Sequence, residues 1–291
     1  MKLATFRHAG TRAVGIVDPA AGRVWPLAGI DDMLDLIRRY DELKRPLEAG
    51  ARTGQGIPLA EVRLEAPIPR PHRNVMCVAK NYHDHVREFG RSGYDSSAGK
   101  DPDAVPTVPI IFTKASDSVI ADGEAIRYPE GVSDRVDYEA ELGVVIGTGG
   151  RGIRREEAYA HVFGYTIIND MTARDWQGRH KQWFLGKSFD TFCPMGPYLV
   201  TADEIDPENL DLRCWVNGEL RQEANTRDLI FDIPTLIETI SAGVSLYPGD
   251  VIATGTPSGV GIGFDPPRFL QRGDVVKIEI SGIGTLTNPV A

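Results

Sequence analysis

The sequence predicts an α+β fold in which strands dominate. Glycine and proline are frequent, with 31 and 20 among 291 residues, against usual shares of about 7% and 5%, so many turns are expected. Stretches with strand-like alternation outnumber stretches with helical spacing, and no regular succession of strand and helix is visible. With 42% hydrophobic and 25% charged residues, the composition excludes disorder as the main state.

The first part of the chain predicts a small N-terminal domain. Residues 2–26 contain short apolar runs separated by turns, and residues 31–47 carry apolar side chains at helical spacing. A proline cluster follows at 67–71. We therefore divide the chain into a small domain, 1–69, and a larger one, 70–291. No group of residues in the small domain indicates a chemistry.

The larger domain predicts strands, short helices and loops in succession. One long stretch without periodicity, 91–108, is expected to be a surface loop, and loops of this length often close over a site. Helices are expected at 80–90, 154–161 and 233–240. Strands are expected at 74–79, 109–114, 137–147, 164–170, 250–255 and in the segment 274–290, with a hairpin over 212–222.

Charge and cysteine content exclude several classes of protein. The net charge is −9 and no basic tract occurs, which argues against nucleic-acid binding. Three widely spaced cysteines form no CxxC pair, which fits a reducing cytoplasm better than a disulfide framework. The longest charge-free stretch, 251–264, is glycine-rich and shorter than the ~18 apolar residues of a membrane span. We expect a cytoplasmic protein that binds neither membrane nor nucleic acid.

Two acidic residues open a predicted buried strand. Glu139 and Glu141 are two positions apart, so they point to the same face of a strand whose next residues are apolar. Neighbouring buried carboxylates repel each other unless a cation neutralises them. A divalent metal would do so, although two acids at a solvated strand end would give the same pattern.

A second polar cluster follows the apolar strand predicted at 164–170. Asp170 could supply a third carboxylate oxygen, and Arg174 and Gln177 lie four and seven positions further, on one face if a helix follows. The alternative is an ordinary helix start with a capping side chain and a surface arginine. Three carboxylate ligands would select a hard ion, Mg²⁺ or Mn²⁺, over zinc.

A histidine and a glutamate lie three positions apart in the predicted helix 80–90. His85 and Glu88 would be neighbours there, and a carboxylate beside an imidazole favours general-base chemistry. An exposed helix with an incidental pair would look the same. Lys187 occurs in a Gly-Lys-Ser triplet, but Lys181 stands where a phosphate-binding loop requires glycine, so a nucleotide site is rejected. The glycine-rich segment 254–261 could offer N–H groups and hydroxyls to an anion.

Seven motifs follow one another along the larger domain. They are KNYHDHVREFG, PIIFTKASDSVI, DYEAELGVVIG, GYTIINDMTARDWQ, FLGKSFDTFCPMGPYL, VNGELRQ and DVIATGTPSGVG. Together and in this order they resemble the motifs of the fumarylacetoacetate hydrolase family. The resemblance covers roughly residues 70–290 and is closest to acylpyruvate hydrolases, oxaloacetate decarboxylases or tautomerases, and 2-hydroxyhepta-2,4-diene-1,7-dioate isomerases.

The resemblance implies a mixed β-sandwich roll, a homodimer and a role for each matched residue. The metal ion would be Mg²⁺, with Mn²⁺ or Ca²⁺ possible. His85 and Glu88 resemble the family's water-activating pair, carried on a segment that can close as a lid. The other implied roles are metal ligands for Glu139, Glu141 and Asp170, charge stabilisation for Lys187, and substrate binding for Arg174, Gln177 and Thr256.

The implied function is Mg²⁺-dependent hydrolysis of a C–C bond in acylpyruvate-type 2,4-dioxo acids such as fumarylpyruvate or acetylpyruvate. The metal would act as a Lewis acid that stabilises an enolate. The same site could instead serve an oxaloacetate decarboxylase or tautomerase, or a hydroxymuconate-type isomerase. A metabolite-binding protein without activity is disfavoured, because every matched site position keeps its functional group.

Overall fold

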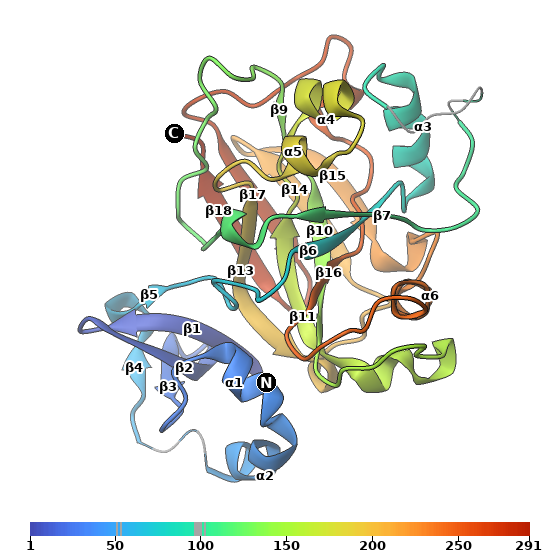
Figure 1. The fold of residues 1–291 in the computed structure, drawn as a ribbon. Helices are drawn as coiled ribbons and strands as arrows, with labels where there is room; N and C mark the ends of the chain where they lie inside the picture. The colour runs from blue at the N-terminus through green and yellow to red at the C-terminus, as the bar shows by residue number, and fades with distance from the viewer. Residues whose placement is uncertain (51, 53, 96–100, 102) are drawn as a thin grey trace.

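The computed structural model describes residues 1–50, 52, 54–95, 101 and 103–291. A large mixed sheet of twelve strands runs through the molecule (Figure 1). Across it lie β4 (Ile57–Pro58), β3 (Arg23–Pro26), β2 (Thr11–Asp18), β1 (Lys2–His8), β13 (Cys193–Thr201), β11 (Val162–Asn169), β10 (Ala140–Ile146), β16 (Val251–Ala253), β6 (Val75–Ala79) and β7 (Ile110–Lys114), with β5 (Arg63–Leu64) beside β1 and β8 (Val119–Ile120) beside β13.

A second sheet packs against the first. Core side chains of the large sheet, such as Val144 and Tyr165, belong to one apolar cluster with Leu212 and Ile278 of the second sheet. The predicted α+β class with dominant strands is confirmed. The second sheet contains β15 (Glu219–Asn225), β14 (Asp211–Val216), β17 (Val275–Ile280) and β18 (Gly284–Pro289), and β12 (Thr172–Ala173) pairs separately with β9 (Val136–Asp137).

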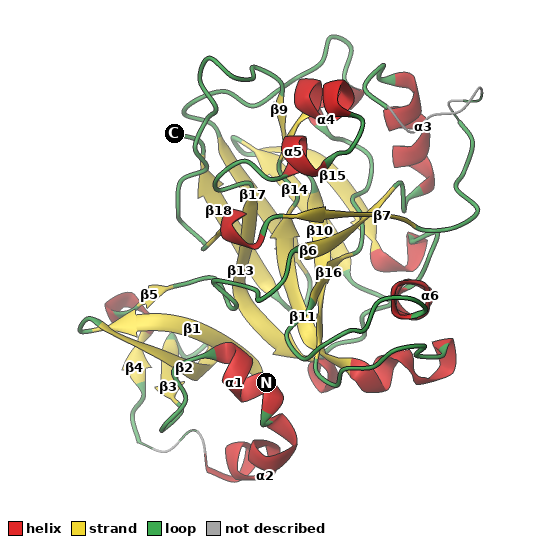
Figure 2. Cartoon of the chain, in the orientation of Figure 1, coloured by secondary structure: helices red, strands yellow, loops and turns green. Residues whose placement is uncertain are grey.

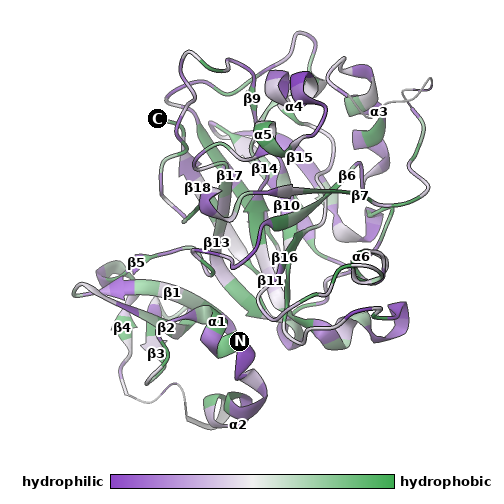
Figure 3. Cartoon of the chain, in the orientation of Figure 1, coloured by the Kyte–Doolittle hydropathy of each residue, from purple (hydrophilic) through white to green (hydrophobic). Residues whose placement is uncertain are grey.

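Helices cover the sheets from outside (Figure 2). Hydrophobic residues concentrate on the central strands and hydrophilic ones on the helices (Figure 3), as burial of one apolar face requires. In the described part of the chain, no helix is long and apolar enough to cross a membrane. The helices are α1 (Met33–Arg38), α2 (Tyr40–Gly50), α3 (His83–Arg91), α4 (Arg174–His180), α5 (Phe184–Lys187) and α6 (Ile233–Ser241).

The N-terminal strands continue the large sheet. Lys2 and Leu3 of β1 pair with Val200 and Leu199 of β13, which joins residues near the start of the chain to a strand that lies almost 200 positions later. The part of the molecule that contains β1–β4 lies to one side of the larger body (Figure 1). The division of the chain into domains at residue 69 stays a prediction.

Two predicted helices take a different form. The segment 31–47 contains a break at Arg39, whose backbone leaves the helical region, and Tyr40 beyond it packs edge-on against Phe163 of β11. The segment therefore forms two helices, α1 and α2, although the spacing of its apolar residues predicts one continuous helix. The segment 154–161 forms a 3₁₀ helix, Arg155–His161, in which Ala158 alone is buried. Since this segment buries so little apolar surface, packing does not stabilise the α-helix predicted there. Of the predicted loop 91–108, residues 96–100 and 102 lie outside the described residues.

Candidate functional site

The two central strands bring three acidic side chains together. β10 and β11 are antiparallel with Ala140 opposite Asn169, so the start of one strand meets the end of the other. Glu139 and Glu141 flank Ala140, and Asp170 follows Asn169. The Asp170 N–H donates to the Glu139 carbonyl at 2.8 Å. One carboxylate oxygen from each of the three acids lies within 4.8 Å of the other two.

Buried cations neutralise two of these acids. Glu139 lies 2.7 Å from Arg174 Nη1 and 2.7 Å from Lys187 Nζ. Asp170 lies 2.7 Å from Lys187 Nζ on one oxygen and 2.7 Å from Lys114 Nζ on the other. Burial alone would raise the pKa of Glu139, but the charges of Lys187 and Arg174 outweigh it and lower that pKa to about 2.

Glu141 lacks such a partner. Among the described residues it forms no ion pair, and its Oε2 accepts a hydrogen bond of 2.9 Å from the Gly255 N–H. Burial raises the pKa of Glu141 well above its usual value, and the negative charges of Asp170 and Glu139 raise it further. A nearby cation would stabilise the ionised form of this carboxyl group.

The donor set fits a divalent cation. The Lys187 ammonium already lies between Glu139 and Asp170, 2.7 Å from each, where positive charge is favoured. Three carboxylate oxygens suit a hard ion such as Mg²⁺, Mn²⁺ or Ca²⁺. Lys80 also lines the cavity, but its charge is paired with Asp95. In the cluster itself the buried acids outnumber the buried cations, so negative charge remains for an added cation to neutralise. These acids are Asp137, Glu139, Glu141 and Asp170, and the cations are Lys114, Arg174 and Lys187.

Helix α4 places Arg174 and Gln177 on its buried face. The predicted helical face does not include Asp170, because β12 lies between Asp170 and the start of α4 at Arg174. Arg174 Nε donates to Asp137 Oδ2 at 2.9 Å, and Nη1 also donates to Gln177 Oε1 at 3.2 Å. Arg174 Nη2 is buried without a hydrogen-bond partner in the described structure. An unpaired donor of this kind is costly, so it is available to an anionic ligand in the cavity that Arg174 lines.

Helix α3 places His85 beside Glu88. His85 Nδ1 lies 3.0 Å from Glu88 Oε2, and Glu88 Oε1 accepts a hydrogen bond of 2.8 Å from the Gly259 N–H. The carboxylate accepts a hydrogen from Nδ1, which leaves Nε2 of His85 as the basic nitrogen. His85 is only 5% exposed and its ring stacks on Phe89. The pair is therefore oriented as a general base requires.

These side chains enclose a very small cavity. Its volume is about 10 Å³, which is room for one water molecule. Because the cavity is so small, its lining must rearrange before a substrate can enter. All but two of the predicted site residues line this cavity; Asp170 and Glu88 lie beside it through their bonds to Lys187 and His85. Its lining includes His85, Glu139, Glu141, Arg174, Gln177, Lys187 and Thr256, together with Lys80, Phe89, Phe112 and Trp183.

Gly263 packs directly against the Glu88 carboxylate. A Cβ at position 263 would lie 1.8 Å from Glu88 Oε1, so Gly263→Ala is expected to displace Glu88 from His85. Losing an orienting partner costs about 10- to 100-fold in activity. We expect a loss of this size in kcat, with little change in melting temperature because the nearest atoms all belong to the side chain of Glu88, which can rotate.

The matched control is Gly243→Ala, since a Cβ there meets no atom within 4 Å. Equal kcat values for Gly263→Ala and Gly243→Ala would contradict a role for the position of Glu88.

Sequence reasoning missed several partners of the site. Lys114 is fully buried, pairs with Asp170, donates to the Met171 carbonyl at 3.0 Å and also donates to the Lys187 carbonyl. Asp137 orients Arg174. A lysine at the end of an otherwise apolar strand was the available signal for Lys114, whereas Asp137 differs from a surface acid only through its long-range contacts. The roles of the predicted residues as ligands, base and substrate contacts stay predictions.

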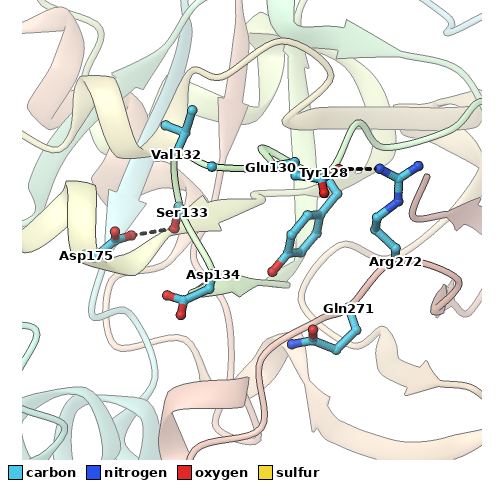
Figure 4. A pocket seen from close by; sticks show the side chains of 9 residues that line it. Tyr128, Glu130, Val132, Ser133, Asp134, Asp175, Gln271 and Arg272 are labelled. Atoms are coloured by element: carbon cyan, nitrogen blue, oxygen red, sulfur yellow. Dashed lines mark hydrogen bonds and ion pairs between the residues drawn. The ribbon is translucent and has the colours of Figure 1, made fainter.

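A larger hollow beside α4 contains none of the predicted site residues (Figure 4). Its volume is about 500 Å³. Arg272 pairs there with Glu130 at 2.7 Å, and Ser133 donates to Asp175. Asp134 adds a further acid, so acids prevail and the hollow does not suit an anionic substrate.

Three converging carboxylates beside a histidine–glutamate pair form a group of side chains typical of metal-dependent enzymes. The chain belongs to the fumarylacetoacetate hydrolase family, as its motifs predict. Residues 74–291 match the fumarylacetoacetate (FAA) hydrolase C-terminal family. Residues 1–67 match the Rv2993c-like N-terminal family.

Similar proteins in this family carry different activities in their names. Oxaloacetate tautomerase YisK of Bacillus subtilis (strain 168) is 52% identical over 233 residues, which are 80% of this chain and 74% of that protein. The structure of fumarylacetoacetate hydrolase from psychrophilic Exiguobacterium antarcticum is 42% identical with a TM-score of 0.84, covering 100% of this chain and 99% of that one. Maleylpyruvate hydrolase from Sphingobium sp. SYK-6, in complex with manganese(II) ion and pyruvate, is 34% identical with a TM-score of 0.80, covering 100% and 99%.

Proposed function

We propose that this chain is a divalent-metal-dependent enzyme that interconverts the keto and enol forms of oxaloacetate or a closely related 2-oxo diacid. The observation that carries the proposal is the His85–Glu88 pair beside three converging carboxylates in a cavity that excludes bulk water. The 52% identity to a tautomerase of oxaloacetate supports this substrate class. The cytoplasmic location and the homodimer stay predictions.

Glu139, Glu141 and Asp170 would hold the metal ion. When bound, the ion supplies a Lewis acid that polarises the 2-oxo group and acidifies the neighbouring C–H. Mg²⁺ remains our choice among hard ions, and the manganese complex of a relative supports a divalent metal in general.

The remaining residues bind the anion and move a proton. The unpaired Nη2 of Arg174 would donate a hydrogen bond to a carboxylate oxygen of the substrate, and the Lys187 ammonium would oppose negative charge that develops on the oxo group. His85 Nε2 removes a proton from the carbon beside the oxo group and returns it to the oxygen. Glu88 stabilises the imidazolium that forms between these transfers.

Hydrolysis of acylpyruvate-type 2,4-dioxo acids with Mg²⁺, the reaction that the sequence resemblance implies, is the second candidate. A specific observation favours it: the likeness to maleylpyruvate hydrolase extends over the whole chain. The cavity has room for one water molecule, which the same His85 could deprotonate. The two reactions therefore differ in whether the base acts on a C–H or on water.

A substrate panel tests the proposal. Purified protein is mixed with oxaloacetate, acetylpyruvate, fumarylpyruvate or a hydroxymuconate, with Mg²⁺, with Mn²⁺ and with excess EDTA. We expect accelerated decay of the enol absorbance of oxaloacetate, dependent on metal. If the protein cleaves the acylpyruvates faster than it accelerates the decay of the oxaloacetate enol, the result would favour the hydrolase. Ligand-induced thermal stabilisation without any turnover would favour a binding protein. Full activity in EDTA would contradict the metal requirement.

A further inference from the structure

A buried amide from the second sheet reaches the candidate site. Gln222 lies in β15 and has no exposed surface. Its Oε1 accepts a hydrogen bond of 3.0 Å from the Ala140 N–H, the backbone group between Glu139 and Glu141. The amide is therefore fixed to the backbone between two of the three converging acids.

The contacts of Gln222 determine which end of its amide is oxygen. Nε2 donates to Thr256 Oγ1 at 2.8 Å and to the Pro257 carbonyl at 2.8 Å. The reverse orientation would set an NH₂ group against the Ala140 N–H and an oxygen against the Pro257 carbonyl. Both contacts would be unfavourable, since donors would face donors and acceptors would face acceptors.

The amide orientation fixes the role of the Thr256 hydroxyl. Its oxygen accepts a hydrogen from Gln222, so its own single hydrogen must point elsewhere. Within the described residues, no protein group accepts that hydrogen. Thr256 lines the same cavity as Glu139 and Glu141 and is 2% exposed. The hydrogen is therefore available to a ligand in the cavity.

We propose that Gln222 is a positioning residue that makes Thr256 an obligatory hydrogen-bond donor, and so selects a carboxylate at this end of the cavity. Without the amide, the hydroxyl can rotate and present a lone pair, which repels an anion. The identification of the ligand as the carboxylate of a 2-oxo acid rests on the proposed function. The donor role itself rests on the hydrogen-bond pattern.

Binding of oxalate to the Mg²⁺-loaded protein, measured by calorimetry, tests the proposal without turnover. Gln222→Leu removes the amide, and Gln222→Glu keeps its shape but offers Thr256 an acceptor. We expect each variant to raise the oxalate Kd about 10- to 100-fold, the effect of one hydrogen bond to a charged group. If the wild type turns over oxaloacetate, KM rises and kcat changes little.

A double-mutant cycle with Thr256→Val separates positioning from general loss of structure. We expect Gln222→Leu to weaken binding no further once Thr256 is valine. Asn288→Leu is the matched control, since Asn288 is a buried amide that donates to the Ala121 and Glu124 carbonyls, away from the cavity lining. It should lower the melting temperature and leave the oxalate Kd unchanged.

Additive effects of the two substitutions, or an unchanged Kd in Gln222→Glu, would overturn the proposal. Failure of the wild type to bind oxalate with Mg²⁺ would overturn it too. Failure of the proposed function is a different result: the wild type would bind oxalate, with the expected dependence on Gln222, yet leave oxaloacetate unchanged.

Discussion

Glu141→Gln is expected to abolish binding of the divalent metal while leaving the metal-free protein at least as stable as the wild type. Glu141 is 1% exposed, lies near two other acids and accepts its hydrogen bond from Gly255. Glutamine keeps the shape and an oxygen for that hydrogen bond but removes the repelled charge. Since a bound metal stabilises developing charge by several kcal/mol, activity should fall about 10³-fold.

Metal content and thermal unfolding check this result. For the wild type, Mg²⁺ at 100 times its Kd should stabilise the fold by about 2.7 kcal/mol, and Glu141→Gln should show no such shift. Glu156→Gln, at an exposed acid on the 3₁₀ helix, serves as control and should behave as wild type. Stoichiometric metal in Glu141→Gln, or marked destabilisation of its metal-free form, would refute the assignment.

His85→Asn is expected to lower kcat by about 10²- to 10⁴-fold, the usual contribution of a general base. Asparagine can still donate to Glu88 but offers no basic nitrogen. Metal and oxalate binding should persist, because no hydrogen bond or ion pair in the described structure joins His85 to the three converging acids. Steady-state kinetics together with calorimetry would show this separation.

His83→Asn on the same helix provides the control, since His83 is exposed. Its kcat should equal that of the wild type. If His85→Asn kept full activity, proton transfer would have to depend on another group, and the proposed role of the His85–Glu88 pair would be wrong.

The spacing of residues in the sequence was sufficient to predict which side chains within one strand or helix lie next to each other. The same-face rule for residues two apart placed Glu139 and Glu141 together, and three-residue spacing on a helix placed Arg174 beside Gln177 and His85 near Glu88. The antiparallel register of β10 and β11 then brings Asp170 to the pair. Nothing in spacing alone predicts that register.

Long-range partners could not be predicted in this way. Lys114 reaches Asp170 across 56 positions and Gln222 reaches Ala140 across 82, so their roles depend on strand order. Burial of a lysine or a glutamine is decided by what packs over it, and the sequence shows no local sign of that. The family resemblance supplied functional roles for residues, whereas spacing supplied only their proximity.

By pairing with β13, strand β1 covers part of an edge of that strand that would otherwise be exposed. Without β1, part of β13 would present unsatisfied N–H and C=O groups along an open border of the large sheet. Such a border is a template for uncontrolled association between molecules. Strand β1 contributes no residue to the cavity of the carboxylates. Its pairing with β13 nevertheless keeps backbone groups of the sheet that carries them from pairing with another molecule.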